Sequence, residues 1–272
     1  MVLPKTIQLV TIVLLSAVAG VINAIAGGGT LLTFPALVGL GVSPIVANAT
    51  STVALWPGVV SSMWGYRDEL SGSTRWAVGF AVPSILGGAI GAWLLLHTPP
   101  SRFAAIVPWL VLGATALFMV QPQILRMIQR HGADEIAHHM PASIVDRTAT
   151  GHLPSAPVLC CQALVGVYGG YFGAGVGIFT LAILGFIGLT NIHRMNGLKN
   201  WAGLCMNAVA ALMFMFSSLV TWPIALSMAV GSIGGGYFGS RAALRTPQRY
   251  VRRAVIVIGL LGGLWLLMKA HA

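Results

Sequence analysis

The sequence predicts an all-α integral membrane protein made of two inverted-topology repeats of helical spans, each opening with a glycine-broken or hairpin helix. Three observations carry this prediction. Hydrophobic residues make up 57% of the chain and charged residues only 7%, too few charges for a water-soluble surface. No Asp, Glu, Lys, Arg or His occurs from Thr6 to Tyr66, a stretch longer than two membrane-spanning helices of about 20 residues each. Finally, the chain repeats itself at a fixed shift of 148 residues.

The repeat is visible without any gap. Residues 81–99 and 229–247 share ten identities in nineteen positions. The same shift aligns Ala26, Gly27, Gly29 and Asn48 with Ala174, Gly175, Gly177 and Asn196. A doubled hydrophobic unit is the usual architecture of a secondary transporter, whose substrate site lies where the halves meet near the bilayer midplane.

Eight apolar segments account for the two halves. They cover residues 6–40, 44–66, 75–97 and 102–121, and then 157–189, 195–217, 221–241 and 251–270. The first segment of each half is too long for one straight span and too short for two, and glycines interrupt it at 26–30 and 172–177. We therefore predict a broken helix at both places and about 8 to 10 membrane segments. The predicted divisions are a first transmembrane repeat (1–121), a polar linker (122–156) and a second transmembrane repeat (157–272).

The basic residues favour inversion of the halves. If each half crosses the membrane an odd number of times, twelve Lys and Arg residues fall on one side and only Lys5, Arg102 and Lys269 on the other. An even number of crossings would place seven of the Lys and Arg residues on one side of the membrane and eight on the other. Because short cytoplasmic loops collect Lys and Arg, we predict a cytoplasmic linker and periplasmic termini. Membrane orientation also explains most of the +10 formal charge, so no nucleic-acid partner is expected.

The glycine breaks are candidate binding elements. Irregular backbone at membrane depth is tolerated only where protein buries it or a water-filled cavity receives it. A helix that starts after a break presents free N–H groups and a partial positive charge, which suits an anion. The alternative is that the glycines only allow close helix packing. Matching breaks in both halves favour a site, with Gly28, Gly29, Thr30, Gly175 and Gly177 as candidate residues. For the later glycines, we expect helix packing instead: Gly87, Gly88, Gly91, Gly235, Gly236 and Gly239.

Polar clusters follow each break inside otherwise apolar helices. They comprise Asn48, Thr50, Ser51 and Thr52 in the first half, and Asn196, Lys199, Asn200 and Asn207 in the second. Polar side chains in membrane helices tend to face the protein interior or a cavity. Lys199 aligns with Ser51, so one half offers hydroxyls and the other an ammonium for an oxyanion. The alternative is that Lys199 marks a helix end and extends to the membrane interface. Weaker candidates are Asn23, Trp56 and Tyr171.

Several classes of function are disfavoured. All five carboxylates are expected in loops, whereas cation pathways place Asp or Glu within the spans, so a charged substrate should be an anion. Three cysteines in apolar segments are expected to be small buried hydrophobes, with no zinc or disulfide pattern. The linker residues His131, His138, His139 and His152 match no standard ligand spacing, so no metal is expected. No catalytic motif and no cofactor motif appears, and we predict that the protein is not an enzyme.

The chain resembles the sulfite exporter TauE/SafE family, also called the toluene sulfonate uptake permease family. The resemblance rests on NAIAGGGTLLTFPALVGLGVSPIVANATSTVAL in the first half and GGYFGAGVGIFTLAILGFIGLTNIHRMNGLKNWAGLCMNAV in the second. It covers the whole chain except 122–156, which is long and unusually charged for the family. The resemblance implies transport of sulfite or small organosulfur anions, such as sulfoacetate, sulfonates or thiosulfate, across the bacterial inner membrane.

The residues and the resemblance together give a mechanistic hypothesis. The N-termini of the broken helices and Lys199 would neutralise an oxyanion, while Asn48, Thr50, Ser51, Asn196 and Asn200 would bond its oxygens. Rocking of one repeat against the other would alternate access. Two alternatives stay open: a passive anion channel on the same scaffold, and a non-transporting membrane scaffold protein that works through its linker. Coupling to protons and formation of a homo-oligomer are also left open.

Overall fold

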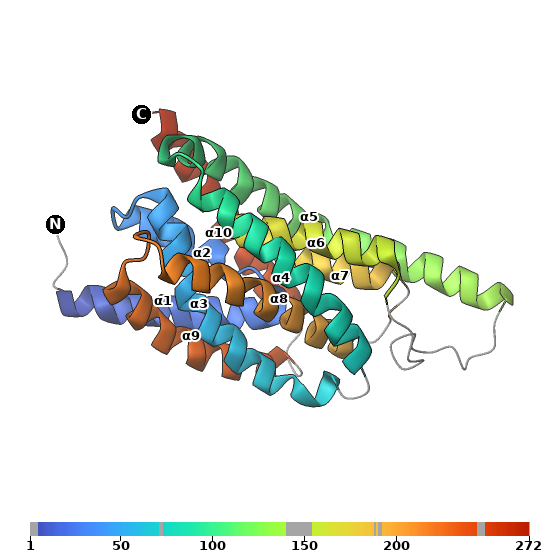
Figure 1. Cartoon of the computed structure of the whole chain (residues 1–272). Coiled ribbons are helices and arrows are strands. Elements are labelled where there is room, and N and C mark those ends of the chain that lie inside the picture. Colours follow the sequence, from blue (N-terminus) through green and yellow to red (C-terminus); the bar gives the residue numbers. More distant parts are fainter. Residues whose placement is uncertain are drawn as a thin grey trace.

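The computed structural model describes residues 5–70, 73–139, 154–187, 189, 192–243 and 248–271, and over these residues the chain forms a bundle of helices without strands (Figure 1). Its first half contains α1 (Lys5–Ala26), α2 (Thr30–Gly39), α3 (Pro44–Gly65), the short 3-10 helix η1 (Arg67–Leu70), α4 (Thr74–Leu96) and α5 (Pro100–His139). Its second half contains α6 (Ala156–Tyr171), α7 (Val176–Phe186), α8 (Ile192–Met215), α9 (Trp222–Ala243) and α10 (Gln248–His271). The shift of 148 residues pairs α1 to α5 with α6 to α10 in order.

Within the described residues, five helices are long and apolar enough to cross a membrane. These stretches are Leu9–Ala26, Thr74–Leu96, Pro100–Gln123, Arg194–Met215 and Val251–Lys269. The helices α2, α6 and α7 are apolar but shorter. The prediction of an all-α integral membrane protein is confirmed.

Glycine ends the first helix of each half, as predicted. The backbone of Gly27 has a φ of +78°, and its N–H donates to the carbonyl of Asn23 at 3.0 Å, which closes the last turn of α1. In the second half Gly173 and Gly175 have φ values of +76° and +75° on either side of the turn between α6 and α7. Only glycine adopts this left-handed backbone at little cost. Gly27 and Gly175 are equivalent positions, so both breaks use the same conformation at the same place.

The two halves interleave rather than lie side by side. Helix α4 packs along α6, and the equivalent α9 packs along α1; α3 and α8 meet between them. The later glycines make these contacts close. A Cβ on Gly91 would overlap the carbonyl oxygen of Val167, and one on Gly239 would lie 2.6 Å from the Cα of Val21. These glycines therefore serve helix packing, as expected.

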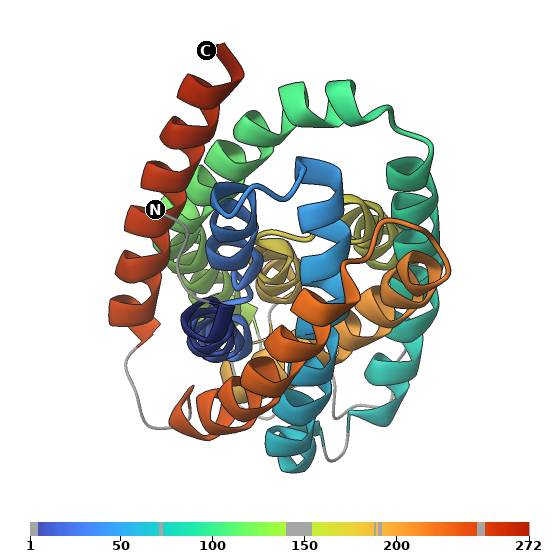
Figure 2. The same ribbon diagram turned by 90° about the vertical axis from the view of Figure 1, so that its left-hand side faces the viewer.

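Equivalent helices run in opposite directions in Figure 1. The start of α1 and the end of α10 lie at one end of the bundle, while the end of α5 and the start of α6 lie at the other. Figure 2 shows α10, in red, and α4, in teal, on opposite outer sides of the bundle.

Large apolar side chains cover the outside of the bundle. Helix α4 exposes Val78, Val82 and Leu86, and α10 exposes Leu261 and Leu264. Contiguous apolar surface of this kind suits a lipid environment rather than water.

The cysteine prediction is wrong. Cys160 and Cys161 are exposed and Cys205 is half-buried. The reason is that α6 is apolar on its outer face as well as its inner one, so apolar surroundings in the sequence do not imply burial.

Helix α5 extends further than the apolar pattern does. It runs for 40 residues to His139, well past Gln123, where its membrane-spanning stretch ends. Asp134 and Glu135 therefore lie on a helix and not in a loop, because residues favourable to helices continue beyond the apolar part. They still fall outside the spanning stretch. Asp68 and Glu69 lie in η1, and Asp146 is outside the described residues.

Candidate functional site

The two helix breaks touch at the centre of the protein. A Cβ added to Gly27 would lie 2.9 Å from the Cα of Gly177, and one added to Gly177 would lie 3.1 Å from the Cα of Gly27. Both glycines are buried. The breaks of the first and second halves are therefore in direct backbone contact, which only residues without side chains permit.

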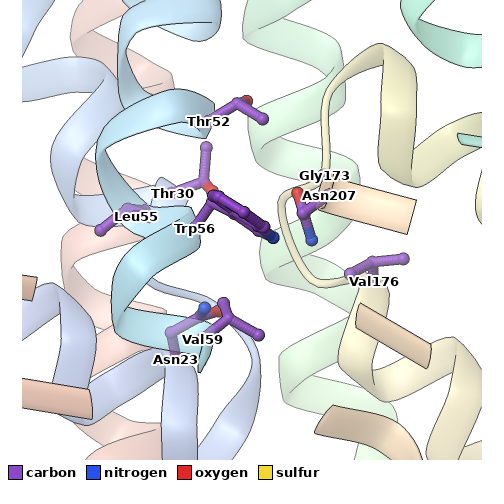
Figure 3. Close-up of a pocket in the computed structure, with 9 residues that line it drawn as sticks. All are labelled: Asn23, Thr30, Thr52, Leu55, Trp56, Val59, Gly173, Val176 and Asn207. Atoms are coloured by element: carbon purple, nitrogen blue, oxygen red, sulfur yellow. The ribbon is translucent and has the colours of Figure 1, made fainter. Parts of the chain in front are cut away.

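A small polar cavity lies beside this contact (Figure 3). Its lining comes from both halves: Asn23, Thr30, Thr52, Leu55, Trp56, Val59, Gly173, Val176 and Asn207. Thr30 and Val176 are the first residues of α2 and α7, so both helices that follow a break begin at the cavity. The cavity is thus bounded by two helix N-termini, the arrangement that favours an anion.

Trp56 provides a hydrogen-bond donor without a partner. Its indole Nε1 is buried and has no hydrogen-bond partner, and the ring points toward Asn207 and Gly173 in Figure 3. A buried N–H without an acceptor costs about 1–3 kcal/mol, so a bound acceptor at this position would be stabilised. Other polar groups of the lining are partly used within their own helices. Asn207 Nδ2 donates to the carbonyl of Gly203 at 2.8 Å, and Thr52 Oγ1 donates to that of Asn48 at 3.0 Å.

Each half caps the broken helix of the other. Asn48 on α3 donates from Nδ2 to the carbonyl of Tyr171, the last residue of α6, at 3.0 Å. On the equivalent helix α8, Lys199 Nζ donates to the carbonyls of Ala24 and Ile25, near the end of α1, at 3.2 and 3.3 Å. These carbonyls lack partners within their own helix because the helix stops there.

Lys199 lies inside the protein, with 3% of its surface exposed. This burial excludes the alternative in which its side chain extends to the membrane interface. An ammonium beside a helix C-terminus interacts favourably with the negative end of the helix dipole. Asn200 reaches the same carbonyl of Ala24 from Nδ2 at 3.5 Å. Lys199 is not among the residues that line the cavity.

The remaining predicted residues do not line the cavity. Thr50 Oγ1 accepts a hydrogen bond from the Thr221 backbone at 3.0 Å, and Ser51 Oγ pairs with Thr33 Oγ1 at 2.5 Å. Asn196 is buried, and its Oδ1 has no partner. The glycines form the breaks themselves: Gly28 packs under the ring of Phe118, Gly29 and Gly175 precede α2 and α7, and Gly177 meets Gly27. Of the eleven candidate residues, Thr30 lines the cavity.

The prediction from the sequence did not include four of the polar residues that line the cavity. Asn23 and Trp56 ranked as weak, and Thr52 and Asn207 appeared only as members of polar clusters. One signal was available: Asn207 is equivalent to Val59 at the shift of 148 residues, and both line the cavity. A polar residue that replaces an apolar one at an equivalent position marks where the halves differ in chemistry.

No metal site is found among the side chains that the structure describes, because no three His, Cys, Asp or Glu residues lie together there. Of the linker histidines, His131, His138 and His139 lie in α5, and His152 is outside the described residues.

Together, the apolar helical bundle, the paired helix breaks and the central cavity define a multi-pass membrane protein of the transporter class. The profile of the sulfite exporter TauE/SafE family matches residues 12–266. The chain therefore belongs to the TauE/SafE family.

Three relatives are named as probable membrane transporter proteins. The chain is 28% identical to the probable membrane transporter protein YfcA of Escherichia coli strain K12 over 255 residues, which is 93% of this chain and 87% of the relative. It is 24% identical to a probable membrane transporter protein of Sinorhizobium sp., covering 89% of this chain and 86% of the relative. A probable membrane transporter protein of Haemophilus influenzae is also 24% identical, covering 89% and 87%. No solved structure matches the chain.

Proposed function

We propose that the protein is a secondary transporter that moves sulfite or a small organosulfur anion, such as sulfoacetate, a sulfonate or thiosulfate, across the bacterial inner membrane by alternating access. The sulfur chemistry comes from the family to which the chain belongs. The anionic character is supported by the central cavity, where α2 and α7 both begin and Trp56 holds an unpartnered donor. That meeting of two helix N-termini at one cavity is the observation that carries the proposal.

Transport would use the two halves as inverted repeats. Their opposed helix directions in Figure 1 and the twelve-to-three division of basic residues support this arrangement. The linker would face the cytoplasm and both termini the periplasm. Since each half caps the broken helix of the other through Asn48 and Lys199, movement of one half would displace the walls of the cavity.

In this proposal the anion occupies the cavity and bonds to Trp56, Asn207, Asn23 and Thr30. Lys199 contributes its charge from behind the end of α1 rather than by direct contact. Asn48, Thr50, Ser51, Asn196 and Asn200 hold the helices around the cavity. The sequence hypothesis had these five residues bond the anion directly. In the present proposal, residues that line the cavity make those bonds instead.

The experiment is flux into proteoliposomes that contain the purified chain. Uptake of sulfite, thiosulfate, sulfoacetate, methanesulfonate and taurine is measured against sulfate and chloride, with and without a pH gradient. Saturable uptake of a sulfur anion, with counterflow from preloaded vesicles, is expected of a carrier. Non-saturable flux without counterflow would identify a passive channel. No flux of any compound through folded protein would sink the proposal.

A further inference from the structure

The cavity is lined by uncharged residues only. Several helix ends, which carry partial charges from the helix dipole, lie around it. All nine lining residues are neutral. None of the five carboxylates of the chain lies in the segments that form the cavity, since they occupy positions 68, 69, 134, 135 and 146. The charge that a bound anion meets therefore comes from helix ends and from buried side chains behind the lining.

These charges can be counted. A helix N-terminus is equivalent to about +0.5 of an elementary charge and a C-terminus to about −0.5. Four helix ends converge at the breaks: the N-termini of α2 and α7, and the C-termini of α1 and α6. Summed over the four ends, these partial charges offset one another, but the two N-termini are the ends whose first residues, Thr30 and Val176, line the cavity.

The charge of Lys199 therefore sets the net charge around the cavity. Among the side chains that the structure describes, it is the only charged one that is buried. Its ammonium bonds to the carbonyls of Ala24 and Ile25, and its Cδ packs against Gly177 at the contact between the breaks. The equivalent residue in the first half, Ser51, is neutral. With Lys199 protonated, the net charge around the cavity is about +1.

We propose that the cavity is selective for monoanions, and this inference rests on the proposed function. One negative charge balances the surroundings, whereas a dianion would leave a second charge uncompensated in a buried site, which is costly. A neutral isostere would leave the positive charge unbalanced. The organosulfur substrates then narrow to hydrogen sulfite and simple sulfonates, and exclude the dianions thiosulfate and sulfoacetate.

The test compares compounds of fixed charge and similar size in the same proteoliposomes. Methanesulfonate is a monoanion, sulfate and thiosulfate are dianions, and methanesulfonamide is a neutral isostere. We expect methanesulfonate uptake at least about tenfold more efficient than thiosulfate uptake, a ratio equal to about 1.4 kcal/mol. Sulfate and methanesulfonamide should compete with methanesulfonate more weakly than unlabelled methanesulfonate by a similar factor.

A variant at Lys199 tests whether its charge selects the ligand. The measurement is the change in melting temperature that each compound causes, which would not depend on ligand charge if Lys199 had only a structural role. In detergent, methanesulfonate should raise the melting temperature of the wild type, and sulfate should not. In Lys199→Met, which removes the unit charge, the response to methanesulfonate should disappear while that to methanesulfonamide rises. Arg67→Gln removes a charge from an exposed side chain of η1 and serves as the matched control.

The outcomes separate the two proposals. Thiosulfate or sulfoacetate carried as efficiently as methanesulfonate would overturn the monoanion inference and leave the transporter intact. No uptake of any sulfur anion would overturn the proposed function itself. If Lys199→Met does not fold, the comparison of monoanion with dianion in the wild type decides the inference alone.

Discussion

The backbones of Gly27 and Gly177 pack directly against each other, one from each half of the chain, at the point where both broken helices turn. A side chain on either glycine would approach the other's Cα to about 3 Å, closer than atoms normally pack. This contact brings the N-termini of α2 and α7 to one cavity, and it is the structural basis of the proposed anion site.

Gly177→Ala should therefore separate the breaks. We expect a loss of about 1–3 kcal/mol in stability from overpacking, together with reduced transport. Thermal unfolding in detergent and uptake into proteoliposomes measure the two effects. Gly203→Ala is the matched control, because a Cβ there meets nothing within 4 Å, and it should be neutral or slightly stabilising. A Gly177→Ala protein that melts and transports like the wild type would show that the close contact is unimportant.

Asn48→Ala should act on stability more than on affinity. The variant leaves the carbonyl of Tyr171 without its donor at the end of α6. Side-chain hydrogen bonds between membrane helices contribute about 0.5–2 kcal/mol, so the unfolding midpoint should fall by a corresponding amount. The KM of the remaining transport should stay close to that of the wild type. A large rise in KM at unchanged stability would instead place Asn48 in direct contact with the substrate.

Trp56→Phe should lower the affinity for the anion more than the stability of the protein. It keeps the ring but removes the unpartnered indole N–H in the cavity. We expect the KM for the transported anion to rise by about three- to tenfold, the loss of one hydrogen bond, with little change in melting temperature. Trp109→Phe makes the same change at an exposed position of α5 and should leave transport unaltered. Equal kinetics for both variants would argue against an anion at Trp56.

The predicted orientation can be tested with reporters fused to the C-terminus. If both termini face the periplasm, alkaline phosphatase should be active there and green fluorescent protein dark. The same reporters inserted at residue 145, in the linker, should give the reverse pattern. Fluorescence at the C-terminus would reverse the assigned orientation, and different sides for the N- and C-termini would refute inverted repeats.

Much of the fold could be predicted because it depends on local chemistry. Glycines at 27–29 and within 173–177 are unfavourable inside a helix, so they predict where each apolar helix ends. The repeat shows that the two breaks lie at equivalent positions. The extent of α5 could not be predicted from hydropathy, because a helix continues wherever its residues allow it, inside or outside the membrane.

The site was harder to predict than the fold. Lys199 stood out in the sequence, but its partners are carbonyls of Ala24 and Ile25, about 175 residues away, and backbone carbonyls leave no trace in a residue pattern. Asn23 and Trp56 looked unremarkable because a single polar or aromatic residue in a membrane helix usually packs. Their significance follows from the interleaving of the halves, which places them at one cavity.

The location of the anion can be measured most directly by substrate protection of a cysteine in the cavity. Asn207→Cys is made in a chain whose Cys160, Cys161 and Cys205 are replaced by alanine, and its reaction with a small methanethiosulfonate reagent is followed in proteoliposomes. Ser218→Cys, at an exposed position between α8 and α9, is the control. We predict that saturating methanesulfonate slows labelling at position 207 and leaves it unchanged at 218. Unchanged labelling at position 207, in protein that still transports the anion, would contradict the cavity as the binding site.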